Sequence, residues 1–325
     1  MRAGKLTGKE LEENVLSVIS HRREEVLKSA SLGGDCARMA LGADMLVHTD
    51  PVTGEAVNIG SLAIEVSAND VIAAGGEPVA FLITLILPES CDASDVKKIM
   101  TDAEREAVAW NAEIVGGHTE FSSAVTRPVV NAVAIGKAAE GWLPHAPEAG
   151  DAVIVTKTLA IEGTVILADM FKNKLALGSS ELTELERYRK STGILPEGRA
   201  LRAARIPCNM HDVTEGGIFG AVCELAAGAG VGVTLYADKV PFGALTLKVC
   251  GKLGVDPYRL ISSGSMLIVA RDGEAVVRAL GEAGIKATAV GHVTDGEGLT
   301  VVYSDGREIH TEIQADELYR FKGEN

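Results

Sequence analysis

Residues 33–51 read GGDCARMALGADMLVHTDP and place an aspartate near each end of a predicted β-hairpin. Gly42 and Ala43 suit a two-residue type II′ turn, because glycine tolerates the positive φ of the first turn position. With that turn, Asp35 lies directly opposite Asp50. Opposed β-carbons are about 5 Å apart and like charges there are destabilising, so the pairing predicts a cation between the two carboxylates. A slipped register or two solvated turn aspartates would explain the same residues without a site.

The composition restricts the class of partner. The chain has 325 residues, enough for one large domain or two ordinary ones. Its hydrophobic content of 46% permits a substantial core, and the aromatic share of 4% means that the core is mainly aliphatic. The net charge of −14 argues against nucleic acid or an anionic membrane as the main partner. A nucleotide remains compatible, because acidic sites bind phosphates through Mg²⁺.

Cysteine usage and hydropathy predict a cytoplasmic protein. The five cysteines are scattered without a C-x-x-C spacing, which is typical of reduced thiols packed as small hydrophobes. The N-terminus does not resemble a signal peptide. The longest apolar run, VAFLITLIL at residues 79–87, is far too short to span a bilayer and predicts a buried strand.

Hydrophobic periodicity predicts the elements of the first half. We expect helices over 6–30, 59–73 and 92–111, and strands over 79–87 and 127–138. The stretch WLPHAPEAGD, residues 142–151, then contains two prolines and a Gly-Asp turn. We therefore place a domain boundary there, which divides the chain into residues 1–145 and 146–325.

The second half also mixes strands with helices. A strand, AVIVTKT at 152–158, is followed by a helix near 162–172, and a further helix, IFGAVCELAAGA, follows HDVTEGG. Later strands are SGSMLIVA, ATAVGHV and LTVVYSD. The chain lacks a regular βαβ alternation, a G-x-G-x-x-G fingerprint and a P-loop. We therefore predict an α+β fold for each half.

Two polar residues interrupt the apolar stripe of the helix over 59–73. Asn69 falls on that stripe and should face inward, and Asp70 lies at its edge. Burying an unpaired carboxylate or amide is costly. The functional interpretation makes Asp70 a third carboxylate beside Asp35 and Asp50. The structural alternative is a helix-terminal polar pair that bonds the local backbone.

The segment IVGGHTE predicts a strand that runs into a turn at Gly116 and Gly117, with His118 and Thr119 at its exit. Exposed amides at such turns bind anions. A glycine pair is common in loops, however, and a lone histidine such as His118 is more often structural than a ligand.

The segment HDVTEGG, in the second half, also allows a structural and a functional interpretation. Asp212 followed by Glu215 resembles an N-capping box before an apolar helix, which alone would explain both residues. Alternatively, a phosphate approaches the free amides at Gly216 and Gly217, and Asp212 adds a metal ligand. Lys157 lies beside a predicted strand-to-helix junction, where it would either meet a phosphate or be solvated.

Taken together, these segments resemble the AIR-synthase (PurM-like) superfamily over residues 30–305. GGDCA resembles the family's G-D-D-A-A motif, VHTDP resembles its T-T-D segment, and SANDVIAAGGEP resembles its N-x-x-D motif. Further along the chain, IVGGHTE resembles the G-G-[DE]-T loop and HDVTEGG resembles the D-[IVP]-[ST]-x-G-G segment. SSGSMLIV and GHVTDG match late segments of the family in order. The HypE-like branch, which acts in hydrogenase maturation, is the most similar because of DPVTG and LITLILPES.

The resemblance implies a two-domain PurM-like fold, a homodimer, and ATP bound through Mg²⁺. Carried over by position, the metal ligands are Asp35, Asp50, Asp70 and Asp212, with Asp50 and Asp212 catalytic; the nucleotide-binding residues are Gly116, Gly117, His118, Thr119, Lys157, Gly216 and Gly217. The implied chemistry is ATP-dependent phosphorylation of an oxygen on an unidentified small-molecule or protein-bound acceptor, in the setting of metalloenzyme maturation. A kinase of the thiamine-monophosphate type and a non-catalytic nucleotide-binding scaffold are the alternatives.

Three departures from the HypE pattern accompany the resemblance. The chain ends DELYRFKGEN, whereas HypE proteins end in a substrate-carrying cysteine. His118 stands where relatives commonly have an acidic residue, and Glu215 stands where HypE has a basic one. These departures leave the acceptor open and favour the scaffold, whereas retention of the four aspartates favours an enzyme.

Overall fold

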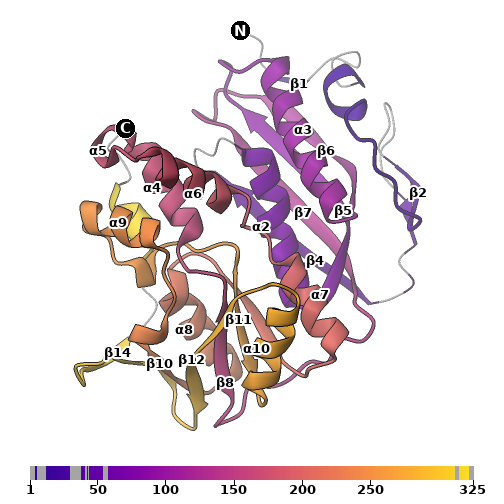
Figure 1. Ribbon diagram of the computed structural model, residues 1–325. Helices are drawn as coiled ribbons and strands as arrows, with labels where there is room; N and C mark the ends of the chain where they lie inside the picture. Colours follow the sequence, from indigo (N-terminus) through magenta and orange to yellow (C-terminus); the bar gives the residue numbers. More distant parts are fainter. Residues whose placement is uncertain are drawn as a thin grey trace. The chain divides into compact units, whose positions relative to one another are not determined.

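The computed structural model describes residues 4–5, 12–29, 38–40, 42, 44–53, 58–311 and 315–321. The chain divides into two compact units, unit 1 (Met1–Ala139) and unit 2 (Glu140–Asn325) (Figure 1). Within the described residues, no helix is both long and apolar enough to cross a membrane.

Unit 1 combines a five-stranded sheet with two long helices. Its elements are β1 (Gly4–Lys5), η1 (Glu12–Leu16), β2 (Val26–Lys28), β3 (Arg38–Met39), β4 (Met45–Val52), α2 (Ile59–Ala73), β5 (Gly76–Leu87), α3 (Ala93–Ala109), β6 (Glu113–Phe121) and β7 (Val129–Ala138). The strand order is β1-β6-β5-β7-β4, in which only β5 and β6 are parallel neighbours.

The two helices lie on one face of this sheet (Figure 1). Helix α2 packs against β4, β5, β7 and α3, and every residue of α2 except Asp70 and Ala73 is buried. Helix α3 is amphipathic and begins with a capping box, in which the Asp92 carboxylate accepts the amides of Ser94 and Asp95. These predicted helices are present because burial and capping both agree with the sequence pattern.

The predicted hairpin over 33–51 is wrong for its described strands, Arg38–Met39 and Met45–Val52, whereas Asp35 and the turn residue Ala43 lie outside the described residues. Strand β3 pairs with β2, where Arg38 lies opposite Lys28, and β4 pairs with β7, where Asp50 lies opposite Ala132. Among the described residues, the ladder partner of Asp50 is therefore Ala132. Long-range pairing with β7 places one face of β4 against α2, where its residues are partly buried.

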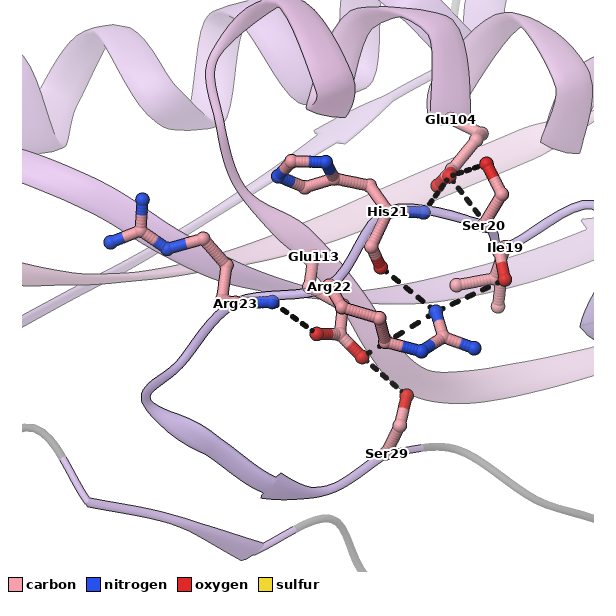
Figure 2. Close-up of polar contacts among 8 residues, drawn as sticks. All are labelled: Ile19, Ser20, His21, Arg22, Arg23, Ser29, Glu104 and Glu113. Atoms are coloured by element: carbon pink, nitrogen blue, oxygen red, sulfur yellow. Dashed lines mark hydrogen bonds and ion pairs between the residues drawn. The ribbon is translucent and has the colours of Figure 1, made fainter.

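The predicted helix over 6–30 is also wrong where the structure describes it. Only Glu12–Leu16 is helical, as one π-turn, and Val26–Lys28 forms β2. Figure 2 shows the reason: the buried carboxylate of Glu104 accepts the amides of Ser20 and His21 at 2.7 and 2.9 Å. These tertiary hydrogen bonds replace the backbone bonds that a helix would make.

The same extended segment has a second buried anchor. Glu113, at the start of β6, accepts the Arg23 amide at 2.9 Å and the Ser29 hydroxyl at 2.5 Å (Figure 2). Its side chain is fully buried, and the Arg22 guanidinium lies 3.7 Å from it. The described chain is thus fixed up to Ser29, next to the stretch that contains Asp35.

Unit 2 is built on a seven-stranded sheet. Its strands are β8 (Ala152–Thr156), β9 (Asn209–Val213), β10 (Gly232–Tyr236), β11 (Ser265–Ala270), β12 (Ala287–Thr294), β13 (Gly298–Val302) and β14 (Glu308–Thr311). Its helices are α4 (Ile161–Met170), α5 (Lys172–Leu175), α6 (Ser179–Arg189), α7 (Leu195–Ala204), α8 (Gly217–Ala229), η2 (Ala237–Lys239), α9 (Ala244–Leu253), η3 (Pro257–Arg259), α10 (Gly273–Glu282) and η4 (Glu317–Phe321). The strand order is β14-β13-β10-β12-β8-β11-β9.

Helices cover both faces of this sheet. Helix α8 packs on the face that carries Val153 and Val155, together with residues of β10, β11, β12 and β13. Helix α10 packs on the opposite face, which carries Ile154, and α7 packs beside α10. A second core joins α4, α6 and α9. Both units therefore mix helices with largely antiparallel sheets, as the α+β prediction requires.

Candidate functional site

Strand β4 and helix α2 bring two of the predicted carboxylates to one face of unit 1. His48 and Asp50 alternate with Thr49 along β4, so their side chains share a face. The His48 imidazole Nε2 lies 3.2 Å from Asp70 Oδ2 of α2, which identifies that face as the one that α2 covers. The Asp70 side chain is 34% exposed, so a ligand can reach it.

The register of the sheet fixes the distance from Asp50 to the glycine pair. Asp50 pairs with Ala132, Ala132 with Ile83, and Ile83 with Gly117, which places all four on one row across β4, β7, β5 and β6. Three strand spacings separate Asp50 from Gly117, or about 14 Å. A magnesium–oxygen distance is about 2.1 Å, so one ion cannot join the two positions directly.

The glycine pair lies within a strand, so the predicted turn at Gly116 and Gly117 is wrong. Both residues belong to β6, and a register shift opposite Phe81 and Leu82 marks a β-bulge. Gly117 has φ +153°, and a Cβ there would lie 1.8 Å from the carbonyl oxygen of Ile83. Glycine is therefore required for the close approach of β5 and β6.

Alternation along β6 separates the residues that follow the glycines. Thr119 pairs with the buried Leu85 on the helix-covered face, whereas His118 pairs with Thr84 on the opposite face. His118 Nε2 lies 3.2 Å from Glu120 Oε2, and the two side chains are 40% and 36% exposed. The sheet therefore places His118 away from Asp50 and Asp70, which the sequence did not predict.

The predicted Mg²⁺ site fits the part of unit 1 that the structure describes. Asp35 lies outside the described residues. Among those that are described, no three histidine, cysteine or acidic side chains gather closely enough to form a metal cage. Magnesium does not need such a cage, because it is usually held by one or two carboxylates together with substrate phosphates. Asp50 and Asp70, which share one face, supply that kind of donor set.

Three loops of unit 2 interlock where the other predicted residues lie. The Ala160 amide donates to the Ser262 hydroxyl at 2.7 Å, and the Ser262 amide donates to the Thr214 carbonyl at 3.3 Å. A Cβ on Gly217 would lie 2.6 Å from the Tyr258 carbonyl oxygen. The structure thus brings together the segments TKTLAIEGT, HDVTEGG and SSGSM, which are far apart in the sequence.

These loops concentrate unusual backbone conformations. Lys157 and Ala160 have φ of 55° and 61°, and Gly216, Gly217 and Gly264 have φ of 79°, 61° and 102°. Left-handed residues other than glycine cost free energy and are enriched at functional sites. The loop cluster is therefore a candidate site in its own right.

The Lys157 ammonium group lies among acceptors of unit 2. Its Nζ lies 2.9 Å from Glu197 Oε1 and donates to the carbonyls of Gly193 and Gly264 at 2.7 and 2.8 Å. The Glu197 side chain is fully buried and the lysine side chain is 26% exposed. The charge of Lys157 therefore holds these loops together, and its predicted contact with a phosphate stays a prediction.

Asp212 is not the predicted helix cap. It lies in β9 opposite Met266 and is 4% exposed, and the N-cap of α8 is Gly216. The Gly216 amide instead donates to Asp316 Oδ2 at 2.7 Å. The capping explanation for Asp212 is therefore wrong. The Gly216 amide, which the sequence analysis assigns to a phosphate, is hydrogen-bonded to the Asp316 carboxylate instead.

Sequence patterns did not identify the buried acids Glu104, Glu113, Glu197 and Asp316. The only signal for Glu104 was its place on the apolar stripe of the helix predicted over 92–111, beside Ala103 and Ala107. Glu197 follows Pro196 at a helix start, and Asp316 lies in a segment without periodicity. Their partners are distant in sequence, which local patterns do not encode.

Comparison with known proteins agrees with the order of these segments. The C-terminal domain of AIR synthase related protein matches residues 148–304, and its N-terminal domain matches residues 31–138. The chain belongs to the AIR synthase related protein family. This confirms the predicted resemblance, including its similarity to HypE proteins.

Two relatives illustrate the range of the family. The carbamoyl dehydratase HypE of Escherichia coli strain K12 is 30% identical, covering 84% of this chain and 81% of its own. The thiamine-monophosphate kinase of Aquifex aeolicus is 25% identical, covering 88% and 92%. A crystal structure of E. coli HypE superposes with a TM-score of 0.82 at 23% identity, covering 97% of this chain and 99% of that one. The two-domain PurM-like fold is therefore confirmed.

Proposed function

We propose that this protein is an ATP- and Mg²⁺-dependent phosphoryl-transfer enzyme of the AIR synthase/HypE type that activates an oxygen of an unidentified acceptor. The main structural support is the placement of Asp50 and Asp70 on one face through His48. The names of relatives add to it, since carbamoyl dehydratase and thiamine-monophosphate kinase both match most of the chain. A HypE crystallised with ATP has the same fold, with a TM-score of 0.76.

The residues have the following proposed roles. Asp35, Asp50 and Asp70 hold Mg²⁺, which neutralises charge on the phosphate oxygens when it is bound. Gly116, Gly117 and Thr119 contact the nucleotide in residues 1–145, the proposed ATP-binding domain, whereas His118, on the opposite face of the sheet, is left out of this contact. In residues 146–325, Lys157, Gly216 and Gly217 contact phosphate, and Asp212 provides a further carboxylate.

The chemical step moves the γ-phosphoryl group of ATP to an acceptor oxygen. The bond from the γ-phosphorus to the bridging oxygen breaks, and a new phosphorus–oxygen bond forms to the acceptor. ADP leaves with the electron pair of the broken bond. The protein's task is positioning and charge stabilisation, as in other phosphoryl transfers.

Calorimetric titration with ATP, with and without Mg²⁺, tests this proposal. Binding should require Mg²⁺ and should be lost in Asp50→Asn, with little change in melting temperature, because the substitution removes a charge without opening a core. Asp44→Asn is the matched control, since Asp44 is exposed immediately before β4. Steady Mg²⁺-dependent ADP release separates an enzyme from a nucleotide-binding scaffold. Asp50→Asn binding ATP normally would overturn the assignment.

A kinase of the thiamine-monophosphate type is the second candidate. The similarity to the A. aeolicus kinase over 88% of this chain favours it. Thiamine monophosphate as acceptor would then stimulate ADP release, and it would be converted to the diphosphate. No stimulation would favour the HypE-like assignment, in which the acceptor differs.

We also propose a cytoplasmic homodimer that forms through the sheet face of unit 1 opposite α2 and α3. Met45 and Val47 on this face are 60% and 57% exposed, and Leu82 is 36% exposed. Exposed apolar residues gathered on one sheet face are typical of an interface. Val47→Asp should shift sedimentation from dimer to monomer, whereas Leu247→Asp, an exposed apolar position in unit 2, should not.

A further inference from the structure

Oxygen atoms from two loops and a helix of unit 2 gather around the Lys157 ammonium group. Its Nζ donates to the carbonyls of Gly193 and Gly264 at 2.7 and 2.8 Å, and to that of Ser191 at 3.5 Å. Glu197 Oε1, from α7, lies 2.9 Å from Nζ, and the Glu197 side chain is fully buried. The other oxygen of that carboxylate, Oε2, is buried and has no hydrogen-bond partner among the described residues. These carbonyl and carboxylate oxygens are here called the oxygen shell.

The oxygen shell offers more acceptors than the lysine has protons. An ammonium group has three N–H donors. Three carbonyl oxygens and Glu197 Oε1 lie within 3.5 Å of it, and Glu197 Oε2 is left over. A buried oxygen without a donor costs free energy, so hydrogen-bonding groups are normally matched in number. A spherical cation is not limited to three partners, because oxygens can contact it from every side. The surplus oxygen therefore points to a site that suits an ion better than three hydrogen bonds.

The backbone conformation brings these carbonyl groups together. A Cβ on Gly264 would lie 2.2 Å from the Ser191 carbonyl oxygen, so only glycine allows the two loops to approach this closely. Lys157 itself has φ 55°, a left-handed conformation that costs free energy for a residue with a side chain. Carbonyl oxygens carry partial negative charge and repel one another when they converge on one point. A positive charge between them makes the arrangement favourable.

The chemistry of the oxygen shell selects a monovalent cation. The Glu197 carboxylate balances a single positive charge, and the other ligands are neutral carbonyls. Backbone carbonyls are the groups that replace the hydration shell of K⁺ in potassium channels. Contacts of 2.7–2.9 Å are too long for Mg²⁺, whose oxygen ligands lie at about 2.1 Å. Potassium and ammonium ions are similar in size, so K⁺ fits where Nζ lies.

We propose that the oxygen shell is a monovalent-cation site in which the Lys157 ammonium group is the resident cation, and that K⁺ binds there when this group is absent. Lys157 is then a positioning residue, whose charge orders the loops of unit 2. Its side chain is 26% exposed, so an ion can enter from solvent once the lysine is truncated. The site does not rest on the proposed function. A phosphate contact of Lys157, which does rest on it, would require the ammonium group to leave the oxygen shell.

Hydrogen–deuterium exchange of the full chain, followed by mass spectrometry, tests this site. The probe is K⁺, titrated as KCl against LiCl at constant ionic strength, because Li⁺ is too small to contact all of these oxygens at once. Exchange over residues 190–199 and 262–266 reports on the loops of the oxygen shell. Exchange over β12 and β13 reports whether the rest of unit 2 keeps its fold.

Two variants remove the ammonium group with different effects on the backbone. Lys157→Ala keeps a side chain at φ 55°, whereas Lys157→Gly relieves the strain of that conformation. Lys239→Ala, at an exposed lysine of η2, controls for the loss of one positive charge. The double variant Lys157→Ala/Glu197→Gln also removes the carboxylate that K⁺ would neutralise.

The expected result is a response to K⁺ in the two single Lys157 variants alone. In LiCl, the loops of the oxygen shell should exchange faster in these variants than in wild type. Added K⁺ should slow this exchange saturably, about tenfold at a concentration ten times its Kd. Wild type, Lys239→Ala and the double variant should exchange equally in KCl and LiCl.

Three outcomes would overturn the proposal. The first is equal exchange in KCl and LiCl in both single Lys157 variants. The second is a K⁺ response that the double variant retains, because the carboxylate would then have no part in it. The third is failure of both single variants to fold in either salt, whereas a variant that folds in KCl and not in LiCl shows the expected rescue.

Mg²⁺-ATP calorimetry on the same proteins separates this inference from the proposed function. A K⁺ response in the single Lys157 variants, with no ATP binding to any protein, would support the cation site and refute the function. ATP binding that depends on Asp50, with no K⁺ response in either single variant, would do the reverse.

Discussion

Replacing Glu25 with glutamine should destabilise unit 1 strongly at neutral pH and weakly at acidic pH. The Glu25 side chain is 5% exposed and is bound by Arg23 at 2.6 Å and Lys137 at 2.5 Å. Burial by itself raises its pKa, but hydrogen bonds from Arg23 and Lys137 outweigh burial and lower the pKa from 4.5 to about 2. This difference corresponds to about 3 kcal/mol of stability at pH 7.

The sign of the pH dependence follows from the lowered pKa. Glu25 contributes its full stabilisation above the unfolded-state value of 4.5 and loses it as the pH falls toward the folded-state value of about 2. Linkage then predicts that the difference between wild type and Glu25→Gln shrinks to about 1.4 kcal/mol at pH 3.

Urea unfolding followed by tryptophan fluorescence measures this difference. The chain has two tryptophans, so a Trp142→Phe background leaves Trp110, which is buried in unit 1, as the reporter. Glu24→Gln is the control, because Glu24 is the exposed neighbour of Glu25. If Glu25→Gln lowers the free energy of unfolding at pH 7 by less than about 1 kcal/mol, the network contributes no more than a surface ion pair, and the argument from a buried network is refuted. A difference that stays constant between pH 7 and pH 3 would refute it as well.

Three further predictions test other contacts. Gly117→Ala should lower the free energy of unfolding by at least about 3 kcal/mol, because the new Cβ would meet the Ile83 carbonyl oxygen. Gly281→Ala is the control: it lies in a helix with open space around it, and it should raise the free energy of unfolding by about 0.5 kcal/mol. Thermal unfolding measures both changes. Lys157→Met should lower the free energy of unfolding by about 3 kcal/mol, because it leaves the buried Glu197 carboxylate without its cation. The double variant Lys157→Met/Glu197→Gln should lose less free energy of unfolding than the sum of the two single variants. Additive losses would contradict the pairing of Lys157 with Glu197. Glu113→Gln should speed amide hydrogen exchange over residues 20–29, because the side-chain NH2 of glutamine cannot accept a hydrogen bond from the Arg23 amide or the Ser29 hydroxyl. Unchanged exchange would show that Glu113 does not anchor that segment.

The sequence predicted best those elements in which local and tertiary preferences agree. Helix α3 begins with a capping box and carries an apolar stripe, and strand β5 is a continuous apolar run. The segment up to Ser29 has the periodicity of a helix, yet Glu104 binds the Ser20 amide from 84 residues away in sequence, and Glu113 binds the Arg23 amide from 90 residues away. Local periodicity contains no information about such partners, so the helix was predicted where an extended segment lies.

The candidate site shows the same division. The motifs identified Asp50, Asp70 and the three loop segments of unit 2, because each stands in a recognisable local context. The motifs did not show that β4 pairs with β7, which turns the supposed partner of Asp50 into Ala132. They also did not show that alternation along β6 turns His118 away from Asp50. Facing and register depend on strand pairing, and pairing is a property of the whole sheet.

Exposure separates Glu113 and Glu197, which stabilise the fold, from Asp70, which remains a candidate for binding a ligand. Glu113 and Glu197 are fully buried, and named donors of the same unit bind each of them, so a ligand cannot reach either without disrupting the packing. Asp70 differs, because its side chain is 34% exposed and its contact with His48 is at a partly exposed position. A chain with a net charge of −14 has many acids, and sequence alone cannot rank them. The structure ranks them by access to solvent, and this ranking, more than the motif alone, makes the face of β4 and α2 the first place to test for Mg²⁺-ATP.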